Sequence, residues 1–220
     1  MKYLIFDSGP LINFAMNGSL DILEKLKKEF DGDFLITKEV KQEIIDTPLT
    51  IKRFELEALQ LKSLYDRGII KLADITPKQV DELRKNRDEI MNTANTTFRT
   101  KKRYIHLIDK GESAVLALSR IVKPNLIVID ERTTRILCEN PENLKKLLEK
   151  KLHTSITANK KNYSYFKDYK VIRSTELAYI AYKKGLFNIK DSNALEAMLY
   201  ALKYRGCSIS EAEVEEVKNS

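Results

Sequence analysis

The chain has 220 residues, a hydrophobic fraction of 43%, a charged fraction of 32% and a formal net charge of +7. These values are typical of a folded globular protein rather than a disordered one, and charged residues interrupt every long apolar run, which excludes a membrane-spanning segment. Cys138 and Cys207 fit no CxxC or Cys/His pattern, so neither a zinc site nor a disulfide framework is predicted and a cytoplasmic location is expected. The sequence also contains no Gly-rich phosphate loop and no GxSxG motif.

The first predicted element is a short strand at 3–6, an apolar run of the kind that is buried on both faces of a parallel sheet. It ends at Asp7, which is followed by Ser8, Gly9 and Pro10, where the chain turns into a helix. Ligand sites in open α/β sheets lie beyond the carboxyl ends of the strands, so Asp7 is a candidate functional residue. The alternative is that Asp7 only caps the helix that follows.

The rest of the chain alternates between strands and helices. Apolar runs predict further strands at 34–36, 68–72, 126–129 and 171–172. Helical periodicity predicts helices at 11–17, 20–30, 38–46, 51–66, 109–121, 132–139, 142–152, 175–184 and 192–204, with a capping box at 210–213 opening a last one. This alternation predicts an α/β fold, a three-layer α/β/α sandwich around a parallel sheet of about five strands. We expect a single domain over residues 1–220.

Two polar segments interrupt this pattern and are predicted to be insertions. Residues 76–103 carry eight basic and four acidic residues, and we expect an exposed helix followed by a mobile polar loop. Residues 140–170 begin with a helix and end in a segment that mixes lysines with aromatic residues. Such a mixture can follow an RNA backbone and stack on its bases, and the candidate residues are Lys160, Lys161, Tyr163, Tyr165 and Lys167. The alternative is a solvated loop whose aromatic rings pack onto the core.

Four acidic residues occur at equivalent places in the predicted fold. Asp7 and Asp130 each directly follow a buried strand, and Glu43 and Glu112 lie in helices entered soon after the same sheet edge. If the first and fourth strands are neighbours, the four carboxylates converge in one crevice. Such a cluster of hard oxygen ligands suits Mg²⁺ or Mn²⁺, which can activate a water for attack on a phosphodiester.

Each acid also has a structural interpretation. Asp109 and Glu112 fit a D-x-x-E capping box, Asp130 is placed to cap the next helix, and Glu43 fits a solvated helix face.

Four segments in the order YLIFDSGPLI, VKQEII, KGESAVLALS and LIVIDERTTR resemble PIN-domain proteins, a family of metal-dependent ribonucleases. The resemblance covers about residues 1–47, 105–139 and 171–210. It implies that Asp7, Glu43, Glu112 and Asp130 are the catalytic acids, and that Asp7, Glu112 and Asp130 hold Mg²⁺ or Mn²⁺. We assign Asp7 and Asp130 as direct metal ligands, with Glu43 and Glu112 as a ligand or water-positioning pair.

The same resemblance implies roles for two further residues and for partners. Ser8 would assist through its hydroxyl, and Arg135 would match a basic residue of the family near the fourth strand. Many relatives are toxins of toxin–antitoxin pairs and dimers are common, so an antitoxin-like protein and a second copy are expected partners. Related chains often have a Gly-rich segment where this chain has Arg-Ser-Thr-Glu at 173–176.

The leading hypothesis is therefore a metal-dependent endoribonuclease that leaves 5′-phosphate and 3′-hydroxyl ends, with RNA as its substrate and no membrane partner. Two alternatives stay open at this point. One is a non-catalytic module that binds RNA or protein on the same scaffold. The other is a structure-specific DNA nuclease, because carboxylate–metal chemistry does not distinguish the sugar.

Overall fold

A computed structural model describes residues 2–124 and 126–219, and its centre is a parallel sheet of five strands. The strand order is β3-β2-β1-β5-β7. The strands are β1 (Lys2–Phe6), β2 (Gly32–Ile36), β3 (Ile70–Leu72), β5 (Leu126–Val128) and β7 (Val171–Ile172). The five predicted strands are thus confirmed, and the first and fourth are neighbours, with Phe6 opposite Val128. Because parallel strands are joined by crossovers, helices cover both faces of this sheet.

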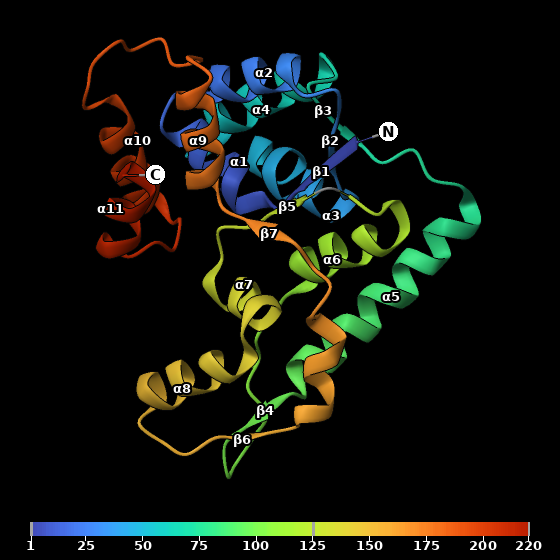
Figure 1. The fold of residues 1–220 in the computed structure, drawn as a ribbon. Coiled ribbons are helices and arrows are strands. Elements are labelled where there is room, and N and C mark those ends of the chain that lie inside the picture. Colours follow the sequence, from blue (N-terminus) through green and yellow to red (C-terminus); the bar gives the residue numbers. More distant parts are fainter. Residues whose placement is uncertain (1, 125, 220) are drawn as a thin grey trace.

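The helices form two layers around the sheet (Figure 1). One layer holds α1 (Ser8–Met16), α2 (Leu20–Glu29), α4 (Glu55–Asp66) and α9 (Ser174–Lys183). The other holds α3 (Lys38–Lys41), α5 (Pro77–Asn95), α6 (Lys110–Val122) and α7 (Arg132–Glu139). This arrangement is the three-layer α/β/α sandwich predicted from the sequence.

The C-terminal helices pack against α9 through a second apolar cluster. They are α10 (Ala194–Arg205) and α11 (Glu211–Asn219), and their buried side chains include Leu199, Leu202 and Val214. None of the helices in the described part of the chain is both long and apolar enough to cross a membrane.

The helix that follows β2 changes its hydrogen-bond pattern part-way along. After α3 the chain continues as a π-helix, η1 (Gln42–Asp46), in which the Thr47 amide donates to the Gln42 carbonyl at 2.9 Å. A 3-10 turn, η2 (Pro48–Thr50), follows, and α4 therefore starts at Glu55 rather than at residue 51 as predicted. Single π turns inside helices are rare overall, and those that occur often lie at functional sites. This π turn contains Glu43.

The two insertions are joined to each other, which the sequence did not predict. The segment expected to be a mobile loop contains β4 (Phe98–Arg99), which pairs antiparallel with β6 (Thr157–Ala158) from the other insertion. The two insertions also supply α8 (Pro141–Leu152) and the 3-10 helix η3 (Lys160–Phe166). Phe98 and Phe166 are fully buried, so each polar insertion contributes a side chain to the main apolar core.

The end of α5 fixes the backbone that leads into α6. Asn95 Oδ1 accepts hydrogen bonds from the amides of Leu107 (2.7 Å) and Ile108 (3.1 Å), and its Nδ2 donates to the Ile108 carbonyl at 3.0 Å. These three bonds satisfy backbone groups that no strand or helix pairs. Asn95 therefore sets where α6 begins.

We expect Asn95→Ala to lower the free energy of unfolding by about 2 kcal/mol, because it leaves buried backbone groups unsatisfied. Urea unfolding followed by circular dichroism measures this. The matched control is Asn92→Ala, which removes an exposed asparagine one turn earlier on the same helix and is expected to change stability by less than about 0.5 kcal/mol. Equal losses from both variants would contradict this role for Asn95.

Candidate functional site

Two aspartates lie side by side at the carboxyl edge of the sheet. Asp7 follows β1, and its amide donates to the Val128 carbonyl of β5 at 3.0 Å. Asp130 lies two residues beyond Val128, and both aspartates are buried. Between them is Gly9, where an added Cβ would lie 3.6 Å from Asp130 Cβ and 4.0 Å from Asp7 Oδ2. The parallel pairing of β1 with β5 thus brings the two carboxylates to one place.

Two glutamates reach the same place from α6 and from the π turn. Ser8 Oγ donates to Glu43 Oε1 at 3.0 Å, which ties the π turn to the start of α1. A Cβ added at Gly111 would lie only 3.2 Å from Glu43 Oε2, so the first turn of α6 contacts Glu43 closely. Glu112 is the next residue of that turn.

The pKa of Asp7 is affected by all three of the other acids. Burial is the largest cause that raises the pKa of Asp7, and the negative charges of Glu112, Glu43 and Asp130 raise it further, to about 8. A hydrogen bond from the Ser8 backbone opposes this rise. Burial also raises the pKa of Glu112, against hydrogen bonds from the backbone amides of Asp109 and of Glu112 itself. A carboxyl group with a pKa near 8 ionises at neutral pH only when a positive charge joins it.

Helix capping, the alternative role for Asp7 and Asp130, does not explain the position of either side chain. Asp7 occupies the N-cap position of α1, but its side chain makes no capping hydrogen bond. For α7 the N-cap is Glu131, whose side chain accepts from the Thr134 amide at 2.6 Å, so the interpretation of Asp130 as this cap is wrong. Glu112 does form the predicted capping box, since its Oε2 accepts from the Asp109 amide at 2.8 Å.

Asp130 is held by residues that the sequence analysis missed. Its Oδ2 accepts from Asn13 Nδ2 (2.6 Å) and from Ser174 Oγ (2.8 Å), and its Oδ1 accepts from the Ser174 amide (2.7 Å). A carboxylate has about four acceptor positions, and with the Cys207 thiol beside it as well, most of those of Asp130 are engaged. Ser174 lies two residues beyond β7, the fifth strand of the sheet, just as Asp130 lies two residues beyond β5, so the same position after a strand also points to it. Asn13 carries no comparable signal.

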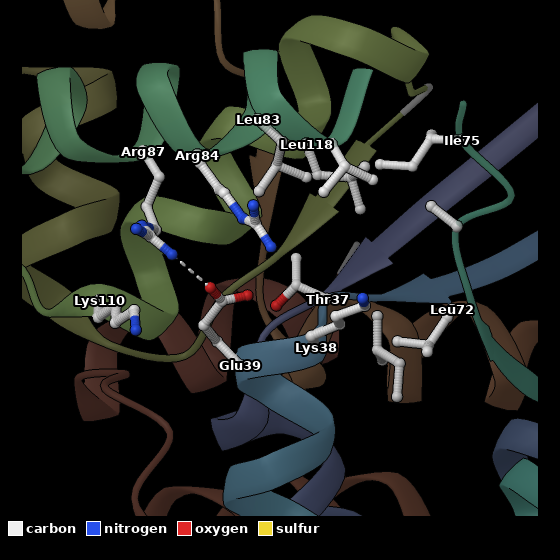
Figure 2. A pocket seen from close by; sticks show the side chains of 13 residues that line it. Thr37, Lys38, Glu39, Leu72, Ile75, Leu83, Arg84, Arg87, Lys110 and Leu118 are labelled. Atoms are coloured by element: carbon white, nitrogen blue, oxygen red, sulfur yellow. Dashed lines mark hydrogen bonds and ion pairs between the residues drawn. The ribbon is translucent and has the colours of Figure 1, made fainter. Parts of the chain in front are cut away.

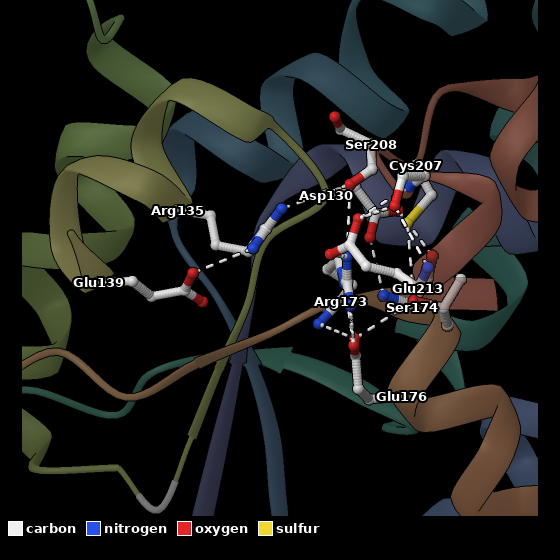
Figure 3. Close-up of polar contacts among 11 residues, drawn as sticks. Asp130, Arg135, Glu139, Arg173, Ser174, Glu176, Cys207, Ser208 and Glu213 are labelled. Carbon is white, nitrogen blue, oxygen red and sulfur yellow. Dashed lines mark hydrogen bonds and ion pairs between the residues drawn. The ribbon is translucent and has the colours of Figure 1, made fainter. Parts of the chain in front are cut away.

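Arg135 lies near the backbone of Asp130 rather than near its carboxylate (Figure 3). Its guanidinium donates to Glu139 at 3.0 Å and to the Ser208 carbonyl at 3.4 Å, and the Ser208 amide donates to the Asp130 carbonyl at 3.2 Å. Arg173 joins the same network through Glu176 and through Glu213, 2.7 Å away. These contacts hold the C-terminal segment next to the backbone of Asp130.

The candidate RNA-binding residues lie apart from the acids, in the lower part of Figure 1 next to α5 and β4. Lys160 pairs with Glu142 at 2.6 Å, and Lys161 and Lys167 are exposed. The ring of Tyr163 contacts Phe98, with centroids 6.0 Å apart, while the Arg120 guanidinium lies 4.0 Å from the centre of the Tyr165 ring. Both tyrosines thus have protein neighbours, which favours packing for the rings and leaves the lysines facing solvent.

The donor set of the cluster fits a hard divalent cation. Asp7, Glu43, Glu112 and Asp130 offer only carboxylate oxygens, and the pKa of Asp7 is raised by burial first and then by the negative charges of the other three acids. Within residues 2–124 and 126–219, no three His, Cys, Asp or Glu side chains are already close enough together to chelate a metal ion. Hydrogen bonds to Ser8 and to the Asp109 amide engage one oxygen each of Glu43 and Glu112, and the other oxygens remain for a ligand.

A family model described as a PIN domain matches residues 3–145, which is more than half of the chain. The chain belongs to the PIN-domain family. PIN domains are generally nucleases and typically use divalent metals, so this is a nuclease-type fold with its acids at the expected edge of the sheet. No curated protein and no solved structure matches the chain. The match ends before β7, so Ser174 and the C-terminal network lie beyond the matched part of the PIN domain.

The raised pKa of Asp7 predicts a specific pH dependence of stability in the metal-free protein. The unfolded chain releases the Asp7 proton near pH 4 and the folded protein near pH 8, so stability that is complete below about pH 4 is lost as the pH rises toward 8. Asp7→Asn removes this loss, and we expect it to exceed the parent in unfolding free energy at pH 8 by at least about 2 kcal/mol.

Urea unfolding with a chelator present, near pH 4 and near pH 8, measures the difference between variant and parent at each pH. Asp31→Asn is the control, because Asp31 is exposed and precedes β2 at the opposite edge of the sheet. A stability gain from Asp7→Asn that is the same at both pH values would show that Asp7 titrates normally.

Proposed function

We propose that this PIN domain is a metal-dependent endoribonuclease whose catalytic acids are Asp7, Glu43, Glu112 and Asp130. The observation that carries the proposal is the convergence of four carboxylates from four segments of the chain, reported by the pKa of Asp7. A structural role alone gives no reason to bury a carboxylate beside three others. Family membership supports the nuclease activity, and the surplus of cations on the insertions supports a polyanionic substrate.

Asp7, Glu112 and the remaining acceptor position of Asp130 would hold Mg²⁺ or Mn²⁺, with Glu43 beside them. A divalent ion bound there lowers the pKa of a coordinated water and stabilises negative charge on the attacked phosphodiester. Hydrolysis adds water across the bond from phosphorus to the 3′ oxygen, and leaves a 5′-phosphate and a 3′-hydroxyl. Ser8 orients Glu43, while Asn13 and Ser174 orient Asp130, so the acids keep their places throughout the reaction.

The first experiment tests the acids. We expect Asp7→Asn to lower Mn²⁺-dependent cleavage of end-labelled RNA by at least about 100-fold, because the variant loses a charged ligand while its shape is kept. Its RNA affinity, measured without metal by filter binding, should stay close to that of the parent. Asp31→Asn is the control and should cleave normally.

The same assay separates the alternatives. A parent protein that binds RNA and yields no metal-dependent product would be a non-catalytic module, and cleavage by Asp7→Asn equal to that of the parent would eliminate the assigned site. RNA and DNA of one sequence are compared side by side, and preferential cleavage of DNA would favour the structure-specific DNA nuclease.

The second experiment tests the exposed lysines of the insertion. Replacing Lys160, Lys161 and Lys167 together by alanine should weaken RNA binding and reduce the dependence of log affinity on log salt by about 0.7 for each lost phosphate contact. The control replaces the same number of lysines at the other end of the molecule, Lys28, Lys62 and Lys190. An unchanged salt dependence in the first variant would remove this segment from the RNA-binding surface. An antitoxin-like partner and a homodimer stay predictions from the family resemblance.

A further inference from the structure

A cavity of about 380 Å³ opens beside the acidic cluster (Figure 2). Its walls come from the ends of β2 and β3, from α3, from the segment between β3 and α5, from the N-terminal half of α5 and from α6. Leu72, Ile75 and Leu83 form an apolar side of the cavity, and all three side chains are partly exposed to solvent. The volume lies in the range of small-molecule and nucleotide pockets.

The cavity and the acidic cluster share a wall. Lys110 lines the cavity and lies two residues before Glu112, while Glu39 lines it one turn before Glu43. The two elements that carry these residues meet where Gly111 closely approaches Glu43. A strand whose phosphate lies among the acids therefore has its neighbouring nucleotide within reach of the cavity.

The charged residues of the cavity favour an anion at its mouth. Lys38 and Lys110 have no ion pair within the described part of the chain. Arg84 is exposed, and its ion pair with Asp81 is long, at 3.5 Å. Uncompensated cations around an apolar pocket match a ligand with a flat apolar part and a phosphate, which is the chemistry of a nucleotide.

Glu39 adds a hydrogen-bond acceptor inside the cavity. Its Oε1 accepts from Arg87 Nη1 at 2.7 Å, and Oε2 accepts no hydrogen bond from any described residue (Figure 2). The ion pair with Arg87 holds this carboxylate in position. Guanine presents two adjacent N–H donors on its Watson–Crick edge, whereas adenine and cytosine present one amino group there. A carboxylate therefore recognises guanine in preference to the other bases.

We propose that this cavity binds one guanine nucleotide of the substrate strand, next to the scissile phosphate. The base lies against Leu72 and Leu83 with its Watson–Crick edge on Glu39, and the phosphates on its two sides lie toward Lys38 and Lys110, which flank Glu39 (Figure 2). The proposal rests on the proposed function for its substrate, a single RNA strand. It adds a base preference that the four acids cannot supply.

The direct test measures binding without metal, so that it does not depend on cleavage. Guanosine, adenosine, cytidine and uridine 5′-monophosphates are titrated into the full-length protein in chelator and followed by isothermal calorimetry. We expect the guanosine nucleotide to bind about tenfold more tightly than the cytidine and uridine nucleotides, and Glu39→Gln to abolish that preference. A pentanucleotide UUGUU should bind more tightly than UUUUU by a similar factor.

Two kinds of variant locate the binding. Val80→Trp fills the cavity from α5 and Ala73→Phe fills it from the β3–α5 segment, and either should abolish the guanosine preference in a protein that circular dichroism shows to be folded. Lys38→Ala with Lys110→Ala should weaken binding of all four nucleotides. The matched control, Lys78→Ala with Lys85→Ala, removes two exposed lysines of α5 that do not line the cavity.

The results of the binding and cleavage measurements distinguish a failure of this proposal from a failure of the proposed function. Asp7→Asn should lose cleavage and retain guanosine binding, so a failure of the catalytic assignment leaves the binding result intact. Equal binding of the four nucleotides, no binding, or a guanosine preference that survives both cavity-filling variants would overturn the proposal. If the protein cleaves RNA, cuts that fall without regard to guanosine would also overturn it.

Discussion

The pairing of β1 with β5 is the constraint on which the rest of the site depends. Their parallel register sets Phe6 opposite Val128, and it delivers Asp7 and Asp130 to one edge of the sheet although they are far apart in the sequence. A shift of one residue in either strand would turn the side chains of that strand to the opposite face. The helices then complete the site, since α6 and the π turn bring Glu112 and Glu43 to the pair of aspartates.

Placing four carboxylates together costs free energy because their negative charges repel one another, and hydrogen bonds from neutral groups offset part of this cost. Ser8, Asn13 and Ser174 donate to these acids, and the Asp109 amide does the same for Glu112. None of these donors carries a formal charge, so they leave the negative charge of the cluster uncompensated. The divalent ion proposed for this site would stabilise the folded state if it binds that state alone.

Much of the architecture and the four acids followed from local patterns, because each predicted strand is a short apolar run and each aspartate directly follows one. The pairing of β4 with β6 could not be found this way. Phe98 and Ala158 are distant in the sequence, and a strand of two residues has no periodicity to detect. In the sequence, the π turn around Glu43 cannot be told from an ordinary α-helix. The cavity at Glu39 depends on how α5 packs against α6, which no local pattern indicates. Ser174 could have been predicted, since it lies two residues beyond β7 as Asp130 lies two residues beyond β5.

The network at Arg173 has a consequence for how this protein can change over time. Arg173 pairs with Glu176 and with Glu213 from the last helix, while Ser174 donates hydrogen bonds to Asp130. Apart from Asp130, these residues lie beyond the part of the chain that the PIN-domain model matches. A segment exchanged at that boundary would keep every carboxylate and lose the groups that orient one of them. An exchange that is to keep the orientation of Asp130 therefore has to carry Ser174 along with the acids.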